Sequence, residues 1–405
     1  MQVKRSIVLL VSTLVGMFCL LITNKLITSV LTQDEFGLFS YSLNFFNFIQ
    51  IITALGVFYP LSRALAKIEN RYEYRKILGL GYFFVLVIFL LQLAIIIISY
   101  FFYFIPYKTE VVSLILISLP FVWIFSANNL SEVLFQSMQN VKFLAFYRFM
   151  PRLLFLVFVA FLTWYLEFIS SLEILYCFLI SYVLVHVSCY FALKPSYDSL
   201  KEKIKAFLRN DFAFGFNVYT GSLISLGAVS FTGVLIGFFN KESSEIGYYN
   251  LAIQLSTPLT LLPNVIATSN YTNFVNSRSL SKKILFLVVF VCILSLLLMY
   301  LSSDFIVKII YGEDYFRVSD INKILIIGYF FYGIADCFNK FLLAKGFGKE
   351  IRNTSIIIGL CLFLSNIILI PKYSASGAAI SVILAGVIYL VFSIYFYFTR
   401  KAFFE

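Results

Sequence analysis

Long apolar runs, separated by short polar segments, recur along the whole of this 405-residue chain. A membrane-spanning helix needs about 20 consecutive apolar residues, because the hydrocarbon core is about 30 Å thick and each residue advances a helix by about 1.5 Å. The sequence holds about twelve such runs, so it predicts an all-α integral membrane protein with about 12 transmembrane helices. Hydrophobic residues make up 61% of the chain and charged residues only 13%. No soluble fold of this length could bury that much apolar surface.

The apolar runs fall into two sets of six. The first set covers residues 6–31, 36–66, 77–105, 111–138, 143–166 and 172–193, and the second covers 212–239, 247–274, 284–301, 321–344, 351–370 and 375–398. Between them lies a polar stretch with an amphipathic pattern. We therefore predict an N-terminal six-helix lobe over residues 1–194, a cytoplasmic amphipathic linker over 195–210, lying on the inner membrane surface, and a C-terminal six-helix lobe over 211–405.

Basic residues are distributed unevenly between the two sides of the predicted bundle. When each of the 31 lysines and arginines is assigned to its nearer membrane side, 24 fall on the side of the N-terminus. The other seven are Lys25, Lys108, Lys241, Lys308, Arg317, Lys323 and Lys372. Because lysine and arginine are enriched in cytoplasmic loops, both termini are predicted to lie in the cytoplasm. The net charge of +11 then reflects this bias and not nucleic-acid binding.

Signatures of catalysis, nucleotide binding and metal binding are missing from the sequence. The glycines at 79–81 and 346–348 lack the spacing of a dinucleotide fingerprint or a P-loop. All six cysteines fall inside predicted spans without CxxC spacing, and the only histidine, His186, lies in the sixth span with no evident partner. We therefore expect a protein that is not an enzyme and that carries no metal or cofactor.

An internal repeat relates the two halves at an offset of 210 residues. The segment 33–40 (QDEFGLFS) aligns with 243–250 (SSEIGYYN), so that a glutamate, a glycine and an aromatic residue coincide. The same offset aligns two polar stripes: Ser40, Asn44, Asn47, Ile51 and Ala54 in the first half, and Asn250, Gln254, Thr257, Leu261 and Asn264 in the second. Their spacings of four and three residues place each stripe on one helical face.

Amides and hydroxyls are costly against lipid, so each stripe must face other helices or a wet cavity. Packing between helices is one interpretation, since such side chains commonly bridge membrane helices. Because equivalent stripes occur in both halves, we favour a shared central cavity in which Asn44, Asn47, Gln254, Thr257 and Asn264 contact a ligand. Pro258 and Pro263 also predict a kinked eighth span.

Charged residues inside the predicted spans indicate what such a cavity would bind. They are Lys25, Arg63, Arg148, Arg152, Asp336 and Lys340. Snorkelling from helix ends is the alternative for Arg63 and Arg148, and Asp336 and Lys340 can instead neutralise each other. An excess of desolvated basic groups needs a counter-charge, so the five cations are predicted to bind an anion, with Asp336 as an ion-coupling group.

Four segments of the chain resemble those of Wzx-type polysaccharide flippases. They are 33–39 (QDEFGLF), 311–315 (YGEDY), 345–349 (KGFGK) and 366–379 (NIILIPKYSASGAA). The resemblance covers nearly the whole chain, and its specificity comes from the order and spacing of motifs that are individually weak. It implies membership of the multidrug/oligosaccharidyl-lipid/polysaccharide exporter superfamily, with two six-helix lobes around a cavity lined by helices 1, 2, 7 and 8.

The resemblance further implies a flippase in the bacterial inner membrane. Its substrate would be a polyprenyl-pyrophosphate-linked oligosaccharide, moved from the cytoplasmic to the outer leaflet by alternating access. The pyrophosphate would supply the anion for the basic residues, and the amides would suit the sugar hydroxyls. Membrane lipids are expected to contact the chain, and binding of polysaccharide polymerase or chain-length proteins is left open.

Three other functions remain to be weighed. An ion-coupled multidrug exporter would share the fold, but it would need acidic cavity residues for cationic substrates, whereas the first span carries Lys25. A membrane-bound polysaccharide polymerase would have a long periplasmic loop, and the largest outer loop expected here covers only residues 302–320. A receptor or scaffold would need a soluble signalling domain.

Overall fold

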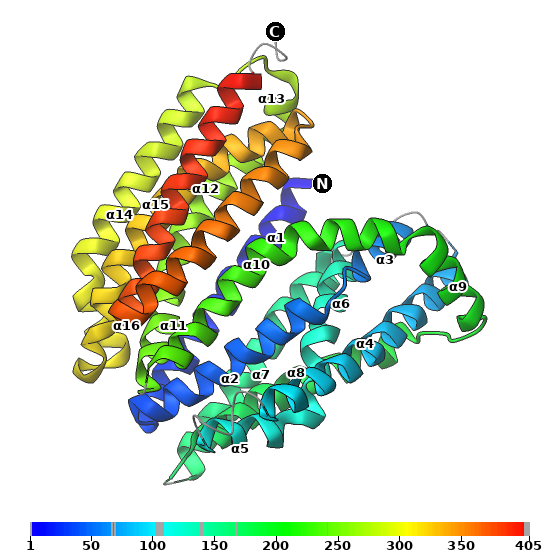
Figure 1. Cartoon of the computed structure of the whole chain (residues 1–405), viewed down its shortest axis with the longest axis horizontal. Coiled ribbons are helices and arrows are strands. Elements are labelled where there is room, and N and C mark those ends of the chain that lie inside the picture. Colours follow the sequence, from blue (N-terminus) through cyan, green and yellow to red (C-terminus); the bar gives the residue numbers. More distant parts are fainter. Residues whose placement is uncertain are drawn as a thin grey trace. The chain divides into compact units, whose positions relative to one another are not determined.

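The computed structural model describes residues 2–65, 68, 70–101, 109–137, 141–166, 168–240 and 242–400 (Figure 1). Within these residues every regular element is a helix and no β-strand occurs. The chain forms two compact units, Met1–Thr220 and Gly221–Glu405, and helix α10 passes from one into the other. The prediction of an all-α fold is confirmed.

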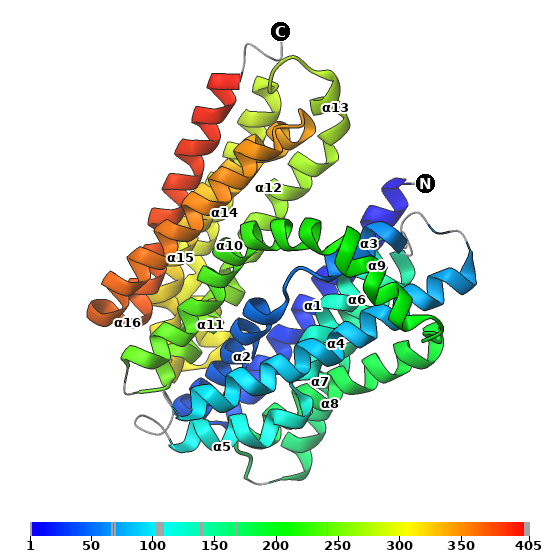
Figure 2. The ribbon, with the colours of Figure 1, turned by 45° about the vertical axis from the view of Figure 1, so that its right-hand side comes forward.

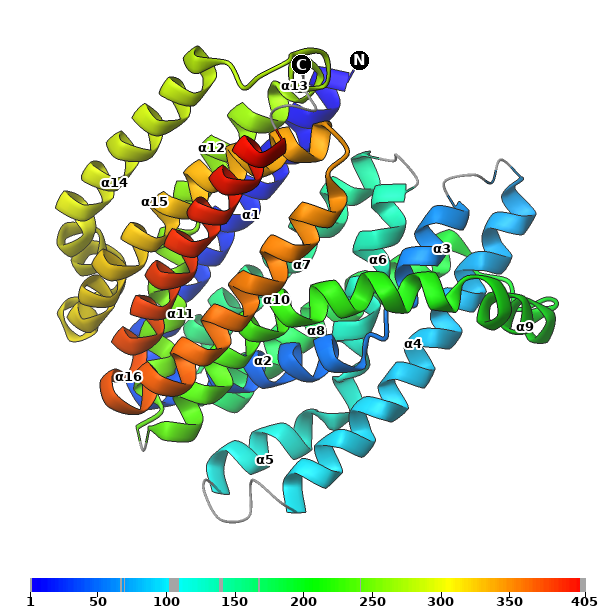
Figure 3. The same cartoon turned by 45° about the horizontal axis from the view of Figure 1, so that its top comes forward.

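The first unit is built from the helices of the first half of the chain. These are α1 (Gln2–Val30), α2 (Gln33–Thr53), α3 (Phe58–Leu65), α4 (Arg71–Ser99), α5 (Thr109–Ser118), the 3₁₀ turn η2 (Leu119–Phe121), α6 (Trp123–Ser137), α7 (Val141–Tyr165), α8 (Ser171–Leu193), α9 (Leu200–Asn210) and the beginning of α10 (Phe212–Phe239). The helices α1 and α7 pack along each other, as Figure 3 shows.

The second unit continues along α10. Its other elements are α11 (Ser244–Ser256), α12 (Pro258–Ser269), α13 (Tyr271–Asn276), α14 (Lys282–Tyr311), the 3₁₀ turn η3 (Glu313–Tyr315), α15 (Phe316–Ala344) and α16 (Gly348–Arg400). The helices α15 and α16 run side by side (Figure 2). Ser374 has φ 56° and ψ −134°, so α16 is two helices joined at a sharp turn.

The described helices account for about twelve membrane passages. Eight helices are long and apolar enough to cross a membrane, and two bent helix pairs bring the number to ten. The turn at Ser374 divides the last of these candidates into two, and α10 contributes the apolar stretch Leu226–Phe239. The described residues thus hold the number of passages that the apolar runs predict.

The second predicted span, residues 36–66, is not one continuous helix. Its two pieces, α2 and α3, are bent by 72°. At the break Leu55 has φ 48° and Gly56 has φ 70°, in the left-handed region where a right-handed helix cannot continue. The fourth span is likewise bent, by 55°, around the 3₁₀ turn that contains Pro120.

The proline-rich eighth span behaves as its sequence predicts. Helix α11 ends at Ser256, Thr257 lies between the two helices, and α12 starts at Pro258. Proline fits the first turn of a helix, where its missing N–H group costs nothing, but it interrupts a helix that precedes it. Thr257 therefore lies at a break in the middle of the stripe to which it was assigned.

Large apolar side chains remain exposed on the outer faces of the helices. On α14, Phe286 is 73% exposed and Leu301 is 79% exposed. Trp164, in the last turn of α7, and Phe168, just beyond that helix, are 84% and 90% exposed. Such surfaces are unfavourable in water but are normal against lipid, and exposed aromatic rings are typical of the membrane–water interface. The chain is a multi-pass membrane protein.

Candidate functional site

Two arginines of the first unit lie where α7 packs against α1. Arg148 and Arg152 are four residues apart, so they share one face of α7. A Cβ atom placed on Gly16 of α1 would lie 2.9 Å from Nη1 and 3.2 Å from Cδ of Arg152. The Arg152 side chain therefore occupies the space that the missing side chain of Gly16 leaves, and the guanidinium also interacts with the Tyr182 hydroxyl of α8.

Arg148 has an acidic partner that the sequence interpretation did not include. Its Nε lies 3.5 Å from Oε1 of Glu132 on α6, and the Arg148 side chain is 29% exposed. Glu132 is a carboxylate inside an apolar span, a placement costly enough to signal a partner, so the sequence held the signal that would have identified it. With Arg148, Arg152 and Glu132 together, this part of the unit carries one net positive charge.

Lys25 lies on the same helix as Gly16 but nearer its other end. Nine residues separate them, which is about 14 Å along the helix axis. The Lys25 side chain is exposed, and within the described residues no ion pair involves its ammonium group. Arg63 lies in the last turn of α3 and is also exposed.

A hydrogen-bonded network lies beside the arginines and corrects the interpretation of His186. The Tyr147 hydroxyl of α7 donates to Oδ1 of Asn128 on α6 at 2.7 Å. The same hydroxyl lies 2.9 Å from Nε2 of His186 on α8. The expectation that His186 has no partner is therefore wrong, because its partner lies on the preceding helix, 39 positions earlier in the sequence.

The first polar stripe becomes more exposed along its length. Ser40 is buried, Asn44 is half-buried and Asn47 is exposed. Nδ2 of Asn44 donates to the backbone oxygen of Ser40 at 3.0 Å, within the same helix. The amide of Asn47 is thus the more accessible of the two for a ligand.

The second stripe surrounds the break between α11 and α12. Gln254, Thr257 and Asn264 are all half-buried. Oγ1 of Thr257 donates to the backbone oxygen of Ile253 at 2.7 Å, and Oδ1 of Asn264 accepts a hydrogen bond from Thr268 at 3.0 Å. These two bonds stay within the chain's own helical turns, and the side chain of Thr257 also forms a hydrogen bond with Tyr329 of α15.

Two other amides of the second unit are buried and form hydrogen bonds between helices. Asn322 of α15 is fully buried, and its Nδ2 donates to Oγ of Ser256 on α11 at 2.8 Å. Asn366 of α16 is also fully buried and donates to Oγ1 of Thr232 on α10 at 2.7 Å. Gln254, Thr257 and Asn264 differ from these two amides in being only half-buried.

Asp336 and Lys340 lie one turn apart on α15 and interact electrostatically, but they do not form a close ion pair. Oδ1 of Asp336 accepts a hydrogen bond from the Tyr389 hydroxyl at 2.7 Å, and that hydroxyl also accepts one from Asn339 at 2.7 Å. Within the described residues the ion pairs do not include Asp336 with Lys340. The carboxylate is therefore held by a tyrosine of α16, and Lys340 remains half-buried one turn away.

The aligned glutamates of the internal repeat make the same contact in each unit. Oε2 of Glu35 accepts the backbone N–H of Ser171 at 2.7 Å, at the start of α8. Oε2 of Glu245 accepts the backbone N–H of Ala375 at 3.1 Å, at the start of the second half of α16. A carboxylate at a helix N-terminus satisfies a free N–H group and complements the helix dipole. Each glutamate thus caps the helix that forms the sixth membrane passage of its half.

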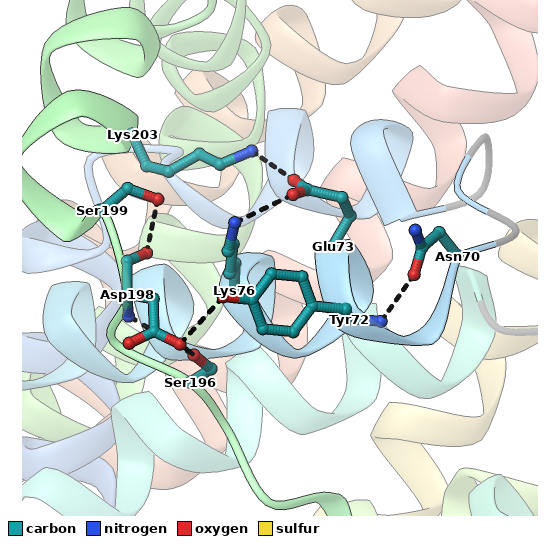
Figure 4. A network of polar contacts seen from close by, with 8 residues as sticks. All are labelled: Asn70, Tyr72, Glu73, Lys76, Ser196, Asp198, Ser199 and Lys203. Atoms are coloured by element: carbon teal, nitrogen blue, oxygen red, sulfur yellow. Dashed lines mark hydrogen bonds and ion pairs between the residues drawn. The ribbon is translucent and has the colours of Figure 1, made fainter.

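The amphipathic linker is docked on α4 (Figure 4). Glu73 pairs with Lys76 at 3.0 Å and with Lys203 of α9 at 2.7 Å. On the apolar face of α9, Phe207 is buried, with its ring centroid 4.7 Å from that of Phe84. The linker therefore has an ion pair and a packed aromatic contact with the first unit.

The loop before α9 makes further polar contacts in the same view. The hydroxyls of Ser196 and Tyr72 donate to Oδ2 of Asp198 at 2.6 and 3.2 Å. These two hydrogen bonds, Ser196 first, lower the pKa of Asp198 below its ordinary value. The loop runs very close to α4, since a Cβ atom on Gly79 would lie 2.0 Å from the backbone oxygen of Ser196.

A metal centre is not indicated by the described residues. Among them no group of three or more histidine, cysteine or acidic side chains is placed to hold a metal ion. The chemistry that the arrangement offers is recognition, through cations and amides.

Comparison with known proteins identifies the family. Residues 3–274, more than half of the chain, match the family described as "Polysaccharide biosynthesis protein". The capsular polysaccharide biosynthesis protein CapF of Staphylococcus aureus is 24% identical over 219 residues, which cover 52% of this chain and 54% of CapF. The chain spans about half the length of the curated relatives it matches.

Solved structures share the fold over almost the whole chain. The lipid II flippase MurJ, in an inward closed conformation, has a TM-score of 0.75 at 20% identity, covering 97% of this chain and 87% of MurJ. An inward-facing multidrug resistance MATE family transporter of the MOP superfamily has a TM-score of 0.71 at 12% identity, covering 98% of each chain. The resemblance seen in the sequence motifs is confirmed: this chain belongs to the polysaccharide biosynthesis protein family and has the fold of the multidrug/oligosaccharidyl-lipid/polysaccharide exporter superfamily.

Proposed function

We propose that this protein is a flippase that moves a polyprenyl-pyrophosphate-linked oligosaccharide from the cytoplasmic to the outer leaflet of the bacterial inner membrane. Membership of the polysaccharide biosynthesis family supports the oligosaccharide. The fold is shared with a lipid II flippase, and this supports a lipid-linked cargo. Alternating access between the two six-helix lobes is the mechanism that such a fold favours.

The observation that carries the proposal is the net positive charge inside the first unit. Arg152 reaches into the space over Gly16, and Glu132 neutralises only one of the two arginines. A cation kept in an apolar span requires a compensating anion, and guanidinium groups match phosphate oxygens in charge and geometry. Arg148 and Arg152 are proposed to bind the pyrophosphate, and Lys25 is proposed to receive it farther along α1.

The other predicted residues are proposed to bind the sugars, to add positive charge and to couple an ion. Asn44, Asn47, Gln254, Thr257 and Asn264 contact sugar hydroxyls. Arg63 and Lys340 add positive charge at helix ends, and Asp336 couples an ion to the cycle. Both termini lie in the cytoplasm, as the basic-residue bias predicts. Polysaccharide polymerase and chain-length proteins are the candidate partners.

The two main alternative functions are a multidrug exporter and a polysaccharide polymerase. The multidrug exporter shares the fold, and Asp336 and Glu132 are acidic groups that a cationic drug could use. The net charge around Arg148 and Arg152 argues against it, because a cationic substrate would be repelled there. The polymerase interpretation loses its support, since the fold is one that transporters adopt.

Complementation of a strain that lacks its polysaccharide flippase tests the proposal. The wild-type chain should restore surface polysaccharide, and Arg152→Ala and Lys25→Ala should each fail to do so. Arg278→Ala is the matched control, because Arg278 is an exposed residue between α13 and α14 and should behave as wild type. Full restoration by both Arg152→Ala and Lys25→Ala, at normal amounts of protein in the membrane, would rule out their proposed role.

A further inference from the structure

The network around His186 determines which ring nitrogen carries the proton. The Tyr147 hydroxyl has a single hydrogen, and it is donated to Oδ1 of Asn128 at 2.7 Å. His186 Nε2, at 2.9 Å from the same hydroxyl oxygen, must therefore be the donor in that contact. A neutral imidazole with its hydrogen on Nε2 has a bare lone pair on Nδ1.

That Nδ1 atom is buried without a hydrogen-bond partner among the described residues. The whole His186 side chain is 2% exposed, and it is enclosed by the rings of Tyr147 and Trp123, with centroids 5.4 and 6.0 Å from its own. Buried polar atoms are nearly always bonded, so an unused acceptor inside a membrane span calls for a functional explanation. A basic ring nitrogen with a free lone pair is a place where a proton can bind.

The charged and titratable groups around His186 come from each helix that packs on α8. Helix α6 contributes Glu132, one turn beyond Asn128, and α7 contributes Tyr147, Arg148 and Arg152. Helix α8 itself adds Tyr182 and Cys189, and α4 places Tyr82 against Tyr190 of α8, with ring centroids 5.0 Å apart. Helix α2 contacts α8 through Phe39 against Phe178 and through Glu35 at the start of α8. The two arginines outnumber Glu132, so the resting surroundings are unfavourable to a positively charged imidazolium.

An anion bound to the arginines would reverse this balance. Arg152 interacts with Tyr182, which lies one turn from His186, and Arg148 directly follows Tyr147. A pyrophosphate at these guanidinium groups would neutralise the local charge and would favour a proton on His186. By linkage, a proton on His186 would in turn strengthen anion binding.

We propose that Nδ1 of His186 is a proton-binding site whose occupancy is coupled to an anionic ligand on Arg148 and Arg152. The inference rests on the proposed function, because it takes the pyrophosphate as the anion. It adds a proton that binds in the first unit, besides the ion assigned to Asp336 in the second. His186 takes up a proton as the anion binds and gives it up as the anion leaves.

The sole histidine of the chain makes the state of His186 directly observable. The full chain would be labelled with ¹⁵N-histidine, purified on a tag free of histidine and placed in lipid nanodiscs for NMR. Without ligand, the Nε2–H tautomer is expected between about pH 6 and 8. Saturation with farnesyl pyrophosphate as the probe should convert it to imidazolium in the lower part of that range. A hydrogen on Nδ1 in the free protein, or an unchanged neutral ring with the probe bound, overturns the proposal.

Proton uptake on binding provides a second readout that separates the two proposals. Titration calorimetry in buffers of different ionisation enthalpy counts the protons taken up per bound probe. The wild type should take up about one proton near pH 6, and His186→Gln should take up none while still binding the probe. Cys361→Ser, a cysteine change on α16 in the second unit, should match the wild type.

The outcomes are distinguishable. Probe binding without proton uptake by the wild type, or equal uptake by the wild type and His186→Gln, overturns the His186 site and leaves the flippase proposal intact. If the wild type does not bind the probe, both the His186 site and the flippase proposal are overturned. If His186→Gln fails to fold, Tyr147→Phe serves in its place. It removes the acceptor of the Nε2 hydrogen and should change the tautomer signal and the pH dependence of uptake.

Discussion

At the scale of single residues, the chain's charges were visible in the sequence and their surroundings were not. Arg148 and Arg152 could be placed on one face because their spacing fixes it. The void at Gly16 that Arg152 fills, and the pairing of Arg148 with Glu132, depend on contacts between helices far apart in the chain. His186 was misjudged for the same reason, since Tyr147 is 39 positions away in sequence.

Filling the space at Gly16 should impair ligand binding without touching a charged residue. A Cβ atom there would lie 2.9 Å from the end of the Arg152 side chain, which must then move. Losing a charge-assisted hydrogen bond costs about 1.5–3 kcal/mol, so Gly16→Leu should weaken binding of a pyrophosphate probe by about 10- to 100-fold. Gly16→Ala should have a smaller effect, because a flexible arginine can shift slightly. Unchanged affinity in Gly16→Leu would show that Arg152 does not need this space.

Gly56→Ala should destabilise the protein more than an alanine at another glycine with positive φ. Gly56 has φ 70°, and a Cβ atom there would lie 2.2 Å from the backbone oxygen of Gly215. The left-handed backbone alone costs alanine about 1–2 kcal/mol, and the backbone clash adds to it. Gly346 has φ 83° with nothing within 4 Å, so Gly346→Ala reports the strain without the clash. Thermal unfolding of the purified variants makes the comparison, and equal melting temperatures would contradict the close contact.

At the scale of helices, apolar runs predict how many passages exist but not where they bend. The break between α2 and α3 falls at Leu55 and Gly56, inside a run that reads as continuously apolar. The Tyr219 hydroxyl donates to the backbone oxygens of Ile51 at 2.9 Å and Ile52 at 2.5 Å, carbonyl groups that a continuing helix would have used itself. Stabilisation of a bend by a tyrosine from another helix is not encoded locally. The break before Pro258 is encoded locally, and it was predicted.

The internal repeat does make a prediction at this scale, through Glu35 and Glu245. Glu35→Gln should loosen the first turn of α8, and Glu245→Gln should loosen the start of the second half of α16, because each loses a charged cap. Caps of this kind contribute about 0.5–2 kcal/mol. Glu245 also pairs with Arg317 at 3.3 Å, so its loss should be the larger.

Hydrogen exchange of the backbone amides measures the loosening. Faster exchange confined to Ser171 and its neighbours, or to Ala375 and its neighbours, is the expected result for the respective variants. Glu242→Gln, at an exposed position just before α11, is the control and should leave both regions unchanged. If the exchange rates near Ser171 and Ala375 were the same in all three variants, the aligned glutamates would have no common structural role.

At the scale of the whole molecule, the fold was predictable because its cause is distributed along the entire chain. Each apolar run indicates a membrane passage independently of the others, so an error in one run does not change the fold class. The motif at 33–39 also lies within the residues that match the family. The ligand is different, because it depends on a few side chains whose neighbours come from several helices. The flippase assignment therefore depends on whether Arg152 binds a lipid pyrophosphate during transport.

Transport by the purified protein in liposomes tests this most directly. A fluorescent polyprenyl-pyrophosphate oligosaccharide would be placed in the membrane, and its movement between leaflets would be followed by quenching from outside. We predict that the wild type accelerates movement well above protein-free liposomes, that Arg278→Ala matches it, and that Arg152→Ala falls by about tenfold or more. Movement no faster than in protein-free liposomes, or equal rates for wild type and Arg152→Ala, would contradict the account.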